Sequence, residues 1–235
     1  MLRTTVIALL IATSAFAQQR SAEEERLHSD WAYLARFRDE NAKLPPPSRG
    51  EKRVVFMGDS ITQVWANFWE KEFDHNPYIN RGISGQTTPQ MLVRFRPDVI
   101  DLKPSAVVIL AGINDIAGNT GSETVEMIEG NIRSMAELAR ANNIAVVLCS
   151  ILPANRLSWR PDIAPAESVL AINRWMEKYA ADHGMAFVDY WTAMADEQQG
   201  LPERLSRDGV HPNEAGYEIM APLVERGIAK ALRKR

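Results

Sequence analysis

Two short segments, far apart in the chain, carry residue types that could perform nucleophilic catalysis. Residues 58–60 read Gly-Asp-Ser and directly follow an apolar run over 53–57, while an Asp-Gly-Val-His run near the other end contains Asp208 and His211. A serine hydroxyl becomes nucleophilic when a neighbouring base takes its proton, and a histidine base needs a carboxylate to fix its tautomer. The two segments together predict a serine hydrolase with Ser60 as nucleophile, His211 as base and Asp208 as the partner of that base.

Two further segments could stabilise a developing negative charge. Residues 82–85 read Gly-Ile-Ser-Gly after an expected strand, and their glycines permit a tight turn that exposes a backbone N–H group. Residues 112–115 read Gly-Ile-Asn-Asp and place the amide of Asn114 after the next strand. A neutral amide donor beside a backbone N–H is what an oxyanion hole requires. Taken alone, each segment is also consistent with ordinary turn chemistry.

The elements that must position these residues alternate regularly along the chain. Apolar runs predict strands at 53–57, 78–80, 106–111, 144–150 and 186–190, and amphipathic segments predict helices near 64–73, 88–101, 122–141, 166–182 and 213–233. Almost wholly apolar strands are typical of a sheet covered on both faces. The pattern predicts an α/β fold, a three-layer α/β/α sandwich around a parallel sheet. Sites in such sheets lie at the carboxyl ends of the strands, where the segments at 58–60, 82–85 and 112–115 would meet.

Taken in chain order, the segments at 58–60, 82–85, 112–115 and 208–211 resemble the SGNH (GDSL-type) esterase and lipase family over roughly residues 52–232. The run over residues 83–88, Ile-Ser-Gly-Gln-Thr-Thr, and the domain length look most like bacterial esterases related to the platelet-activating-factor acetylhydrolase catalytic subunits. The resemblance implies a flavodoxin-like sheet of five parallel strands. Ile61-Thr62 stands where the family name has leucine, a departure that puts no catalytic residue in doubt.

The resemblance also assigns roles to individual residues. It implies that Ser60, Asp208 and His211 form the catalytic triad. It places the oxyanion hole at Gly85, with Gly82 the weaker choice, and at Asn114, joined by the backbone N–H of the nucleophile. The implied chemistry is acyl transfer to water, without a metal or an organic cofactor. A metal site is disfavoured by the residues as well, because the acid and the imidazole lack a third ligand at a matching spacing.

Two residues are expected to contact a small-molecule ester substrate, Asp59 beside the nucleophile and Trp159 in a polar and aromatic loop after the fourth strand. Packing of Trp159 on the domain, in a loop that faces solvent, is equally consistent with the sequence. We expect short acyl groups, acetyl above all, on polar or carbohydrate alcohols. One alternative is a lysophospholipase or thioesterase that uses the same residues on longer acyl chains. Another is a non-catalytic binding module on a hydrolase scaffold, which the complete set of catalytic residues disfavours.

Composition limits the class of protein further. The chain has 235 residues, of which 46% are hydrophobic and 24% charged, and a formal net charge of −3. This suits one well-packed domain and gives no basic field for nucleic acid or an anionic membrane surface. Cys149 is the single cysteine, so an intramolecular disulfide and a cysteine-rich zinc site are excluded. An assembly of identical chains is left open.

The first 50 residues differ in character from the rest. Residues 1–17 combine a positive start, a short apolar run and small residues at 15–17, which predicts a cleaved signal peptide rather than a stable membrane anchor. We therefore expect a secreted or periplasmic protein. Residues 18–50 are expected to form an N-terminal arm with one helix, at 31–37, and residues 51–235 to form the hydrolase domain.

Overall fold

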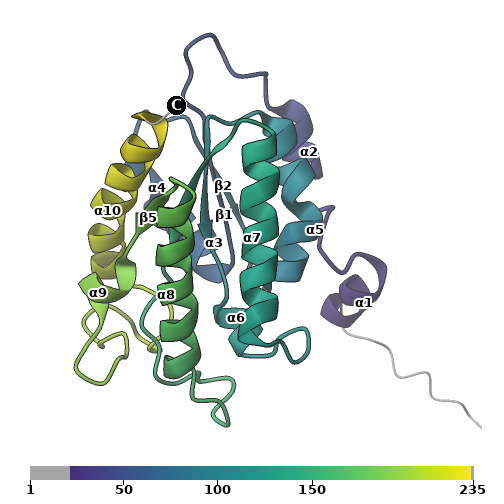
Figure 1. Cartoon of the computed structure of the whole chain (residues 1–235). Helices are drawn as coiled ribbons and strands as arrows, with labels where there is room; N and C mark the ends of the chain where they lie inside the picture. Colours follow the sequence, from purple (N-terminus) through teal and green to yellow (C-terminus); the bar gives the residue numbers. More distant parts are fainter. Residues whose placement is uncertain (1–21, 234–235) are drawn as a thin grey trace, which may run out of the picture.

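The computed structural model describes residues 22–233, and the predicted signal peptide lies outside them. Within this range the chain forms a five-stranded sheet in the order β2-β1-β3-β4-β5, with every neighbouring pair parallel. Helices cover both faces of the sheet (Figure 1). This strand order is the flavodoxin-like one. The predicted α/β/α sandwich is confirmed.

The strands end level with one another where the candidate residues follow them. Gly58, the last residue of β1, pairs with Gly82 of β2 and with Leu110 of β3. The loops after these three strands therefore start at the same height, on the edge that carries α6 in the lower part of Figure 1. The strands are β1 (Val54–Gly58), β2 (Tyr78–Gly82), β3 (Ala106–Leu110), β4 (Ala145–Cys149) and β5 (Ala186–Val188).

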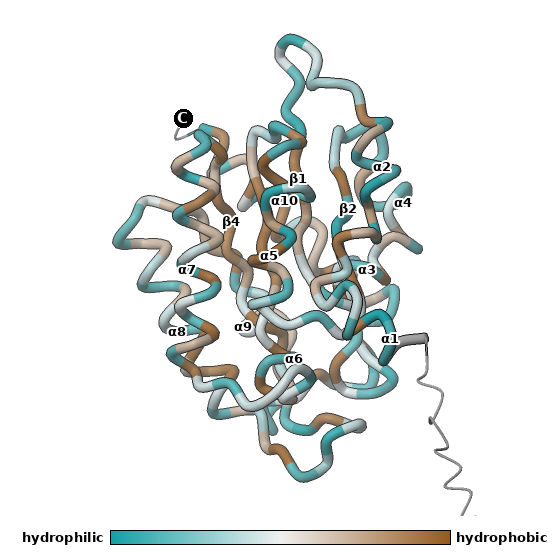
Figure 2. Tube along the Cα trace, turned by 90° about the vertical axis from the view of Figure 1, so that its right-hand side faces the viewer, coloured by the Kyte–Doolittle hydropathy of each residue, from teal (hydrophilic) through white to brown (hydrophobic). Residues whose placement is uncertain are grey.

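Each face of the sheet has its own hydrophobic core. The core on one face is closed by α5 (Thr88–Asp98), α7 (Val125–Ala141) and α8 (Ala166–Asp182). The core on the other face is closed by α3 (Ser60–Trp65), α4 (Trp69–Phe73) and α10 (Glu214–Arg233). In Figure 2 the hydrophobic colour follows β1 and β4 through the middle of the molecule. Shorter helical segments are η1 (Ala66–Phe68), η2 (Ile100–Leu102), α6 (Ile113–Ile116) and α9 (Tyr190–Met194).

Packing between α3 and α10 joins two parts of the chain that both carry candidate catalytic residues. The rings of Trp65 and Tyr217 stack with centroids 5.2 Å apart. The Tyr217 hydroxyl also donates a hydrogen bond of 2.7 Å to the carbonyl of Ile61. Both aromatic side chains are buried, so the start of α10 is held at a fixed distance from the start of α3.

The N-terminal arm differs from the prediction of a single helix at 31–37. Its described part has two helices, α1 (Ala22–Ser29) and α2 (Arg38–Lys43), and the residues between them form turns. The carboxylate of Asp30 accepts hydrogen bonds from the backbone N–H groups of Leu34 and Ala35, and Tyr33 has a φ of +55°. These side-chain bonds compete with a regular helix, although the apolar spacing favours one.

The arm is packed on the sandwich through hydrogen bonds to its backbone. Gln86 and Gln90 donate to the carbonyls of Ala32 and Trp31, at 2.8 and 2.7 Å. No helix within residues 22–233 has the length and apolar character needed to cross a membrane.

Candidate active site

Ser60 stands at the junction of β1 and α3. The strand ends at Gly58, the carboxylate of Asp59 accepts a hydrogen bond of 2.9 Å from the Ile61 N–H, and the helix begins at Ser60. Asp59 is therefore the N-cap of α3. The N–H of Ser60, at the first position of the helix, has no partner inside the helix. The Ser60 hydroxyl oxygen lies 2.8 Å from Nε2 of His211. The strand-to-helix turn therefore delivers both the hydroxyl and its backbone N–H to the edge of the sheet.

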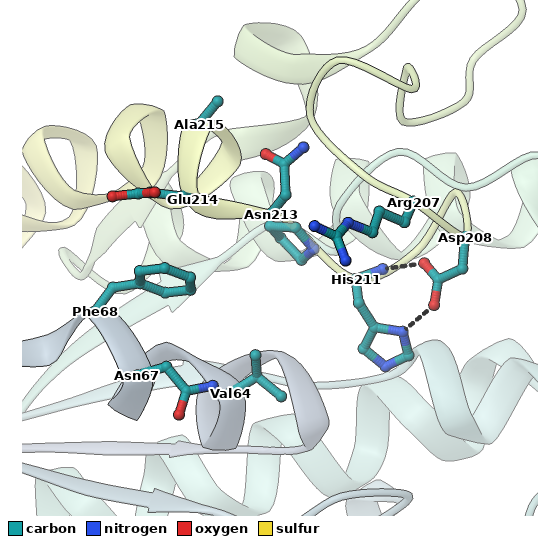
Figure 3. A pocket seen from close by; sticks show the side chains of 10 residues that line it. Val64, Asn67, Phe68, Arg207, Asp208, His211, Asn213, Glu214 and Ala215 are labelled. Atoms are coloured by element: carbon teal, nitrogen blue, oxygen red, sulfur yellow. Dashed lines mark hydrogen bonds and ion pairs between the residues drawn. The ribbon is translucent and has the colours of Figure 1, made fainter.

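The loop before α10 fixes His211 through Asp208 (Figure 3). One carboxylate oxygen, Oδ2, accepts from Nδ1 of the imidazole at 2.6 Å. The other, Oδ1, accepts from the backbone N–H groups of Val210 and His211 at 2.9 and 2.8 Å. The Ser206 hydroxyl closes the loop by donating to the His211 carbonyl at 2.7 Å. The result is a serine–imidazole–carboxylate chain whose acid and base lie on one stiff loop.

The electrostatics of Asp208 suit a permanent negative charge. Partial burial disfavours the charged form, but hydrogen bonds from the His211 backbone and imidazole and from the Val210 N–H outweigh it and lower the pKa of Asp208 to about 2. The carboxylate is therefore ionised at neutral pH and can stabilise an imidazolium ion when His211 accepts a proton.

Gly85 and Gly82 differ in what their backbone requires. Gly85 has a φ of +77°, a left-handed conformation that favours glycine, and no hydrogen bond from its N–H is found within the described residues. At Gly82 an added Cβ would lie 2.2 Å from the backbone nitrogen of Gln63, so this glycine permits close packing of α3 against β2. The geometry therefore favours Gly85 over Gly82 as an oxyanion donor.

Asn114 lies at the start of α6, on the other side of Ser60 in the sheet. Its Nδ2 donates to the carbonyl of Gln86 at 3.0 Å and, more weakly, to Oδ2 of Asp59 at 3.3 Å. The amide is buried and faces the β1–α3 turn. The Ser60 and Gly85 N–H groups and this amide can thus supply three donors around the nucleophile.

Asp59 is buried beneath the site rather than exposed beside it. Burial raises the pKa of its carboxyl group to about 7. One oxygen caps α3 and the other accepts from Asn114, so the group has no exposed surface with which to contact a substrate.

Trp159 lies beside the imidazole, with its indole centroid 6.2 Å from that of His211. Its Nε1 donates to Oδ1 of Asn119 at 3.3 Å, and the guanidinium of Arg160 donates to the carbonyl of Ala117. These contacts dock the loop of Trp159 onto the loop after α6. Asn119 was not among the predicted site residues, and no local pattern distinguishes it from other turn asparagines.

A groove of about 720 Å³ lies beside His211, between α3–η1 and the start of α10. Figure 3 shows Phe68 at the left of it, Asn67 and Val64 below, and the Arg207 side chain reaching in from the loop. Glu214 is engaged by Lys71 at 2.8 Å, whereas Asn67 and Arg207 have no hydrogen-bond or ion-pair partner within residues 22–233. Besides Asp208 and His211, the groove is lined by Val64, Asn67, Phe68, Arg207, Pro212, Asn213, Glu214 and Ala215.

The family model described as "GDSL-like Lipase/Acylhydrolase family" matches residues 56–219, which include Ser60, Asp208 and His211. The chain belongs to that family. Its description names lipases and acylhydrolases, which supports carboxylic ester hydrolase activity, as predicted. A solved GDSL-like lipase from Bacteroides thetaiotaomicron is 46% identical, with a TM-score of 0.83, and the match covers 86% of this chain and 100% of that one.

Curated relatives are more distant. An acetylxylan esterase of Xylanibacter ruminicola is 23% identical over 79% of this chain, which spans 45% of that relative's length. Esterase TesA of Pseudomonas aeruginosa is 29% identical, and the match covers 69% of this chain and 77% of that esterase.

No group of three or more histidine, cysteine, aspartate or glutamate residues within the described part of the chain is arranged to hold a metal ion.

Proposed function

We propose that this protein is a serine esterase that removes short acyl groups, acetyl above all, from carbohydrate alcohols. The observation that carries the proposal is the pair of hydrogen-bond distances in one line, 2.8 Å from the Ser60 hydroxyl to Nε2 of His211 and 2.6 Å from Nδ1 to Asp208. Family membership supports ester hydrolysis as the reaction class.

In the first half-reaction, Ser60 Oγ attacks the ester carbonyl while Nε2 of His211 takes its proton. The carbonyl oxygen becomes an oxyanion, held by the N–H groups of Ser60 and Gly85 and by the amide of Asn114. The carbon–oxygen bond to the alcohol then breaks, and the imidazolium gives its proton to the leaving oxygen. A water molecule repeats the sequence on the acyl-enzyme, with His211 again as base, and releases the acid and free Ser60.

The acyl side of the site is short in this proposal. The Gly85 and Asn114 donors lie on the loops after β2 and β3, and the docked Trp159 loop bridges from Asn119 to the imidazole of His211. In this proposal the indole bounds the space that the acyl group occupies. This supports acetyl over long chains, and a lysophospholipase or thioesterase would need that wall to move.

The alcohol side corresponds to the groove beside His211. The leaving oxygen must lie within reach of Nε2, so the alcohol extends to the side of the imidazole that faces away from the oxyanion donors. The groove offers Phe68 as an aromatic surface and the free polar groups of Asn67 and Arg207. An aromatic ring with unengaged hydrogen-bonding groups suits a carbohydrate, and about 720 Å³ lies within the ~300–1,000 Å³ typical of small-ligand sites. The acetylxylan esterase among the relatives adds support.

Location and domain organisation belong to the same proposal. Residues 1–17 have the composition of a signal peptide, so we propose a secreted or periplasmic enzyme whose hydrolase domain is residues 51–235. Export would bring the enzyme to polymeric carbohydrate outside the cytoplasm.

The test is kcat/KM for acetyl, butyryl, octanoyl and palmitoyl p-nitrophenyl esters, followed by acetylated xylo-oligosaccharides. We expect the maximum at acetyl. A maximum at octanoyl or beyond would identify a long-chain hydrolase instead, and no turnover of any ester would favour a binding module.

The alcohol side is tested separately with Phe68→Ala. We expect about a tenfold loss on the oligosaccharides, equivalent to about 1.4 kcal/mol of contact, and little change on p-nitrophenyl acetate. Met127→Ala serves as the control, because it shortens an exposed apolar side chain on α7 (52% exposed). Equal losses on both substrates would remove the groove from the alcohol site.

A further inference from the structure

Asn119, which lies outside the predicted catalytic set, connects three residues around the site. Its Nδ2 donates to Oδ1 of Asn114 at 3.0 Å and to the carbonyl of Gly85 at 3.2 Å. Its Oδ1 accepts from the indole of Trp159 at 3.3 Å. Both ends of this amide are therefore used on groups of the candidate site, two of which belong to the proposed oxyanion hole.

The backbone of Asn119 is itself fixed. Its N–H donates to the carbonyl of Asn114 at 3.0 Å, so the chain folds back on the start of α6. The return is made at Gly118, whose φ of +68° is left-handed and whose N–H donates to the Asp115 carbonyl at 2.8 Å. The side chain at position 119 thus starts from a closed loop and has a defined direction.

The bond from Asn119 fixes the orientation of the Asn114 amide together with the Gln86 carbonyl, because the first engages the amide oxygen and the second the amide nitrogen. With Oδ1 of Asn114 occupied, Nδ2 points to the carbonyl of Gln86 at 3.0 Å and to Asp59 at 3.3 Å. Asp59 directly precedes Ser60, so the N–H of the longer bond is the one that can turn to an oxyanion on the serine. A reversed amide would present its oxygen there instead and would repel the developing charge.

We propose that Asn119 is a positioning residue that holds the Asn114 amide and the Gly85 peptide in the arrangement needed to bind the oxyanion. It acts through these two groups and touches neither the nucleophile nor the base. The proposal rests on the proposed esterase function.

The test is Asn119→Ala, measured as kcat per active site with p-nitrophenyl acetate and with sites counted by burst titration. Loss of an oxyanion donor costs about 10²–10³ in kcat, and a loosened donor costs part of that. We therefore expect a fall of about 10- to 100-fold in kcat, with KM within about threefold. In an Asn114→Ala background the same change should cost no more than about threefold, because residues that act as one unit are not additive.

Two companion variants keep the test sharp. Asn142→Ala removes an exposed amide at the end of α7 that, within residues 22–233, bonds to the Leu138 carbonyl alone, and it should leave kcat unchanged. Asn119→Asp keeps an acceptor for Trp159 but loses both donations, so it should lose at least as much kcat as Asn119→Ala.

Three outcomes would overturn the proposal. A full additional loss in the Asn114→Ala background would mean that Asn119 acts independently of that amide. A change confined to KM would make it a substrate contact, since its side chain is exposed at the mouth of the site. A normal kcat per titrated site with fewer sites would mean a role in folding alone. An inactive wild-type enzyme would instead refute the proposed function.

Discussion

Replacing Asp208 with asparagine should reverse the tautomer of His211. The carboxylate now accepts two backbone N–H groups at Oδ1 and the imidazole Nδ1 at Oδ2. An asparagine amide has one acceptor end and one donor end. If its oxygen keeps the two backbone bonds, its NH₂ group faces Nδ1, which must then accept, and the proton moves to Nε2. The opposite orientation would place the NH₂ group of the asparagine against the two backbone N–H groups, so that hydrogen-bond donors would face donors.

The magnitudes favour the first orientation. It retains both backbone bonds, each contributing about 1 kcal/mol, so at least roughly nine molecules in ten should adopt it. With Nε2 protonated, the imidazole cannot take the proton of Ser60. The same reversal in serine proteases lowers kcat by about 10⁴, and we expect a loss of that order, about 5 kcal/mol in the activation barrier.

The cost in stability should be much smaller. A shift of the Asp208 pKa from 3.8 to about 2 corresponds to about 2 kcal/mol, which we discount to ~1 kcal/mol because the side chain is 38% exposed. A lowered carboxyl pKa gives stability that is present above about pH 4 and is lost as the pH falls toward 2. At neutral pH the variant should therefore remain folded while it loses nearly all turnover.

The assay combines kcat on p-nitrophenyl acetate with the ¹⁵N shifts of the imidazole, which report the tautomer. Asp189→Asn is the matched control, since Asp189 caps α9 through the Thr192 N–H and asparagine can cap equally well. More than a tenth of wild-type activity in Asp208→Asn, or an imidazole still protonated at Nδ1, would refute the reasoning.

Four further substitutions test the remaining parts of the site. Ser60→Ala and His211→Ala should each lower kcat by up to ~10⁶, the double variant being little worse, and more than a few per cent of residual activity would remove the assignment. Asn114→Ala should lower kcat by about 10²–10³ with a smaller change in KM, whereas a change in KM alone would make it a ground-state contact. As the pH rises from about 4 to 7, the free energy of unfolding of the wild-type protein should decline, and Asp59→Asn should abolish this decline, as measured by urea unfolding. The decline arises because the Asp59 pKa is raised from 3.8 to about 7 in the folded state, which therefore binds more protons in that interval than the unfolded state. An unchanged pH slope in the variant would contradict this assignment to Asp59.

The strands could be predicted from the sequence because they are continuous apolar runs. β2 was the shortest prediction, at residues 78–80, and it extends to Gly82. Its polar residues are accommodated by specific partners, since Asn80 bonds to the Thr62 carbonyl at 2.6 Å and Arg81 to Asn41 at 2.7 Å. Such partners lie elsewhere in the chain and leave no signal in the strand itself.

The start of α3 was expected near residue 64 and lies at Ser60. The apolar periodicity of this helix begins late, and the cap that starts it is the Asp59 side chain, which the sequence led us to expect at the substrate. The same residue type can cap a helix or face a ligand, and burial decides between the two. Burial is a property of the assembled sheet rather than of the tripeptide.

The individual segments of the site were therefore predictable, but the contacts between them were not. The sequence predicts a nucleophile, an acid and base, and two oxyanion candidates, because each depends on residue types within a few positions of one another. What holds them together is a set of single contacts between distant segments. The Tyr217 hydroxyl reaches Ile61 from 156 positions away, and Asn119 joins Gly85 to Asn114. Tyrosine and asparagine are common enough that their position alone carries no prediction.

These contacts also divide the site between the two faces of the sheet. The base is carried by the loop before α10 and is set against α3 by the core that contains Trp65 and Tyr217. Two of the three proposed oxyanion donors, the Gly85 N–H and the Asn114 amide, lie on the loops that lead into α5 and α6, above the other core. Ser60 stands at the boundary between them. Repacking of one face should therefore move the base relative to Gly85 and Asn114, and repacking of the other should move these two donors relative to the base.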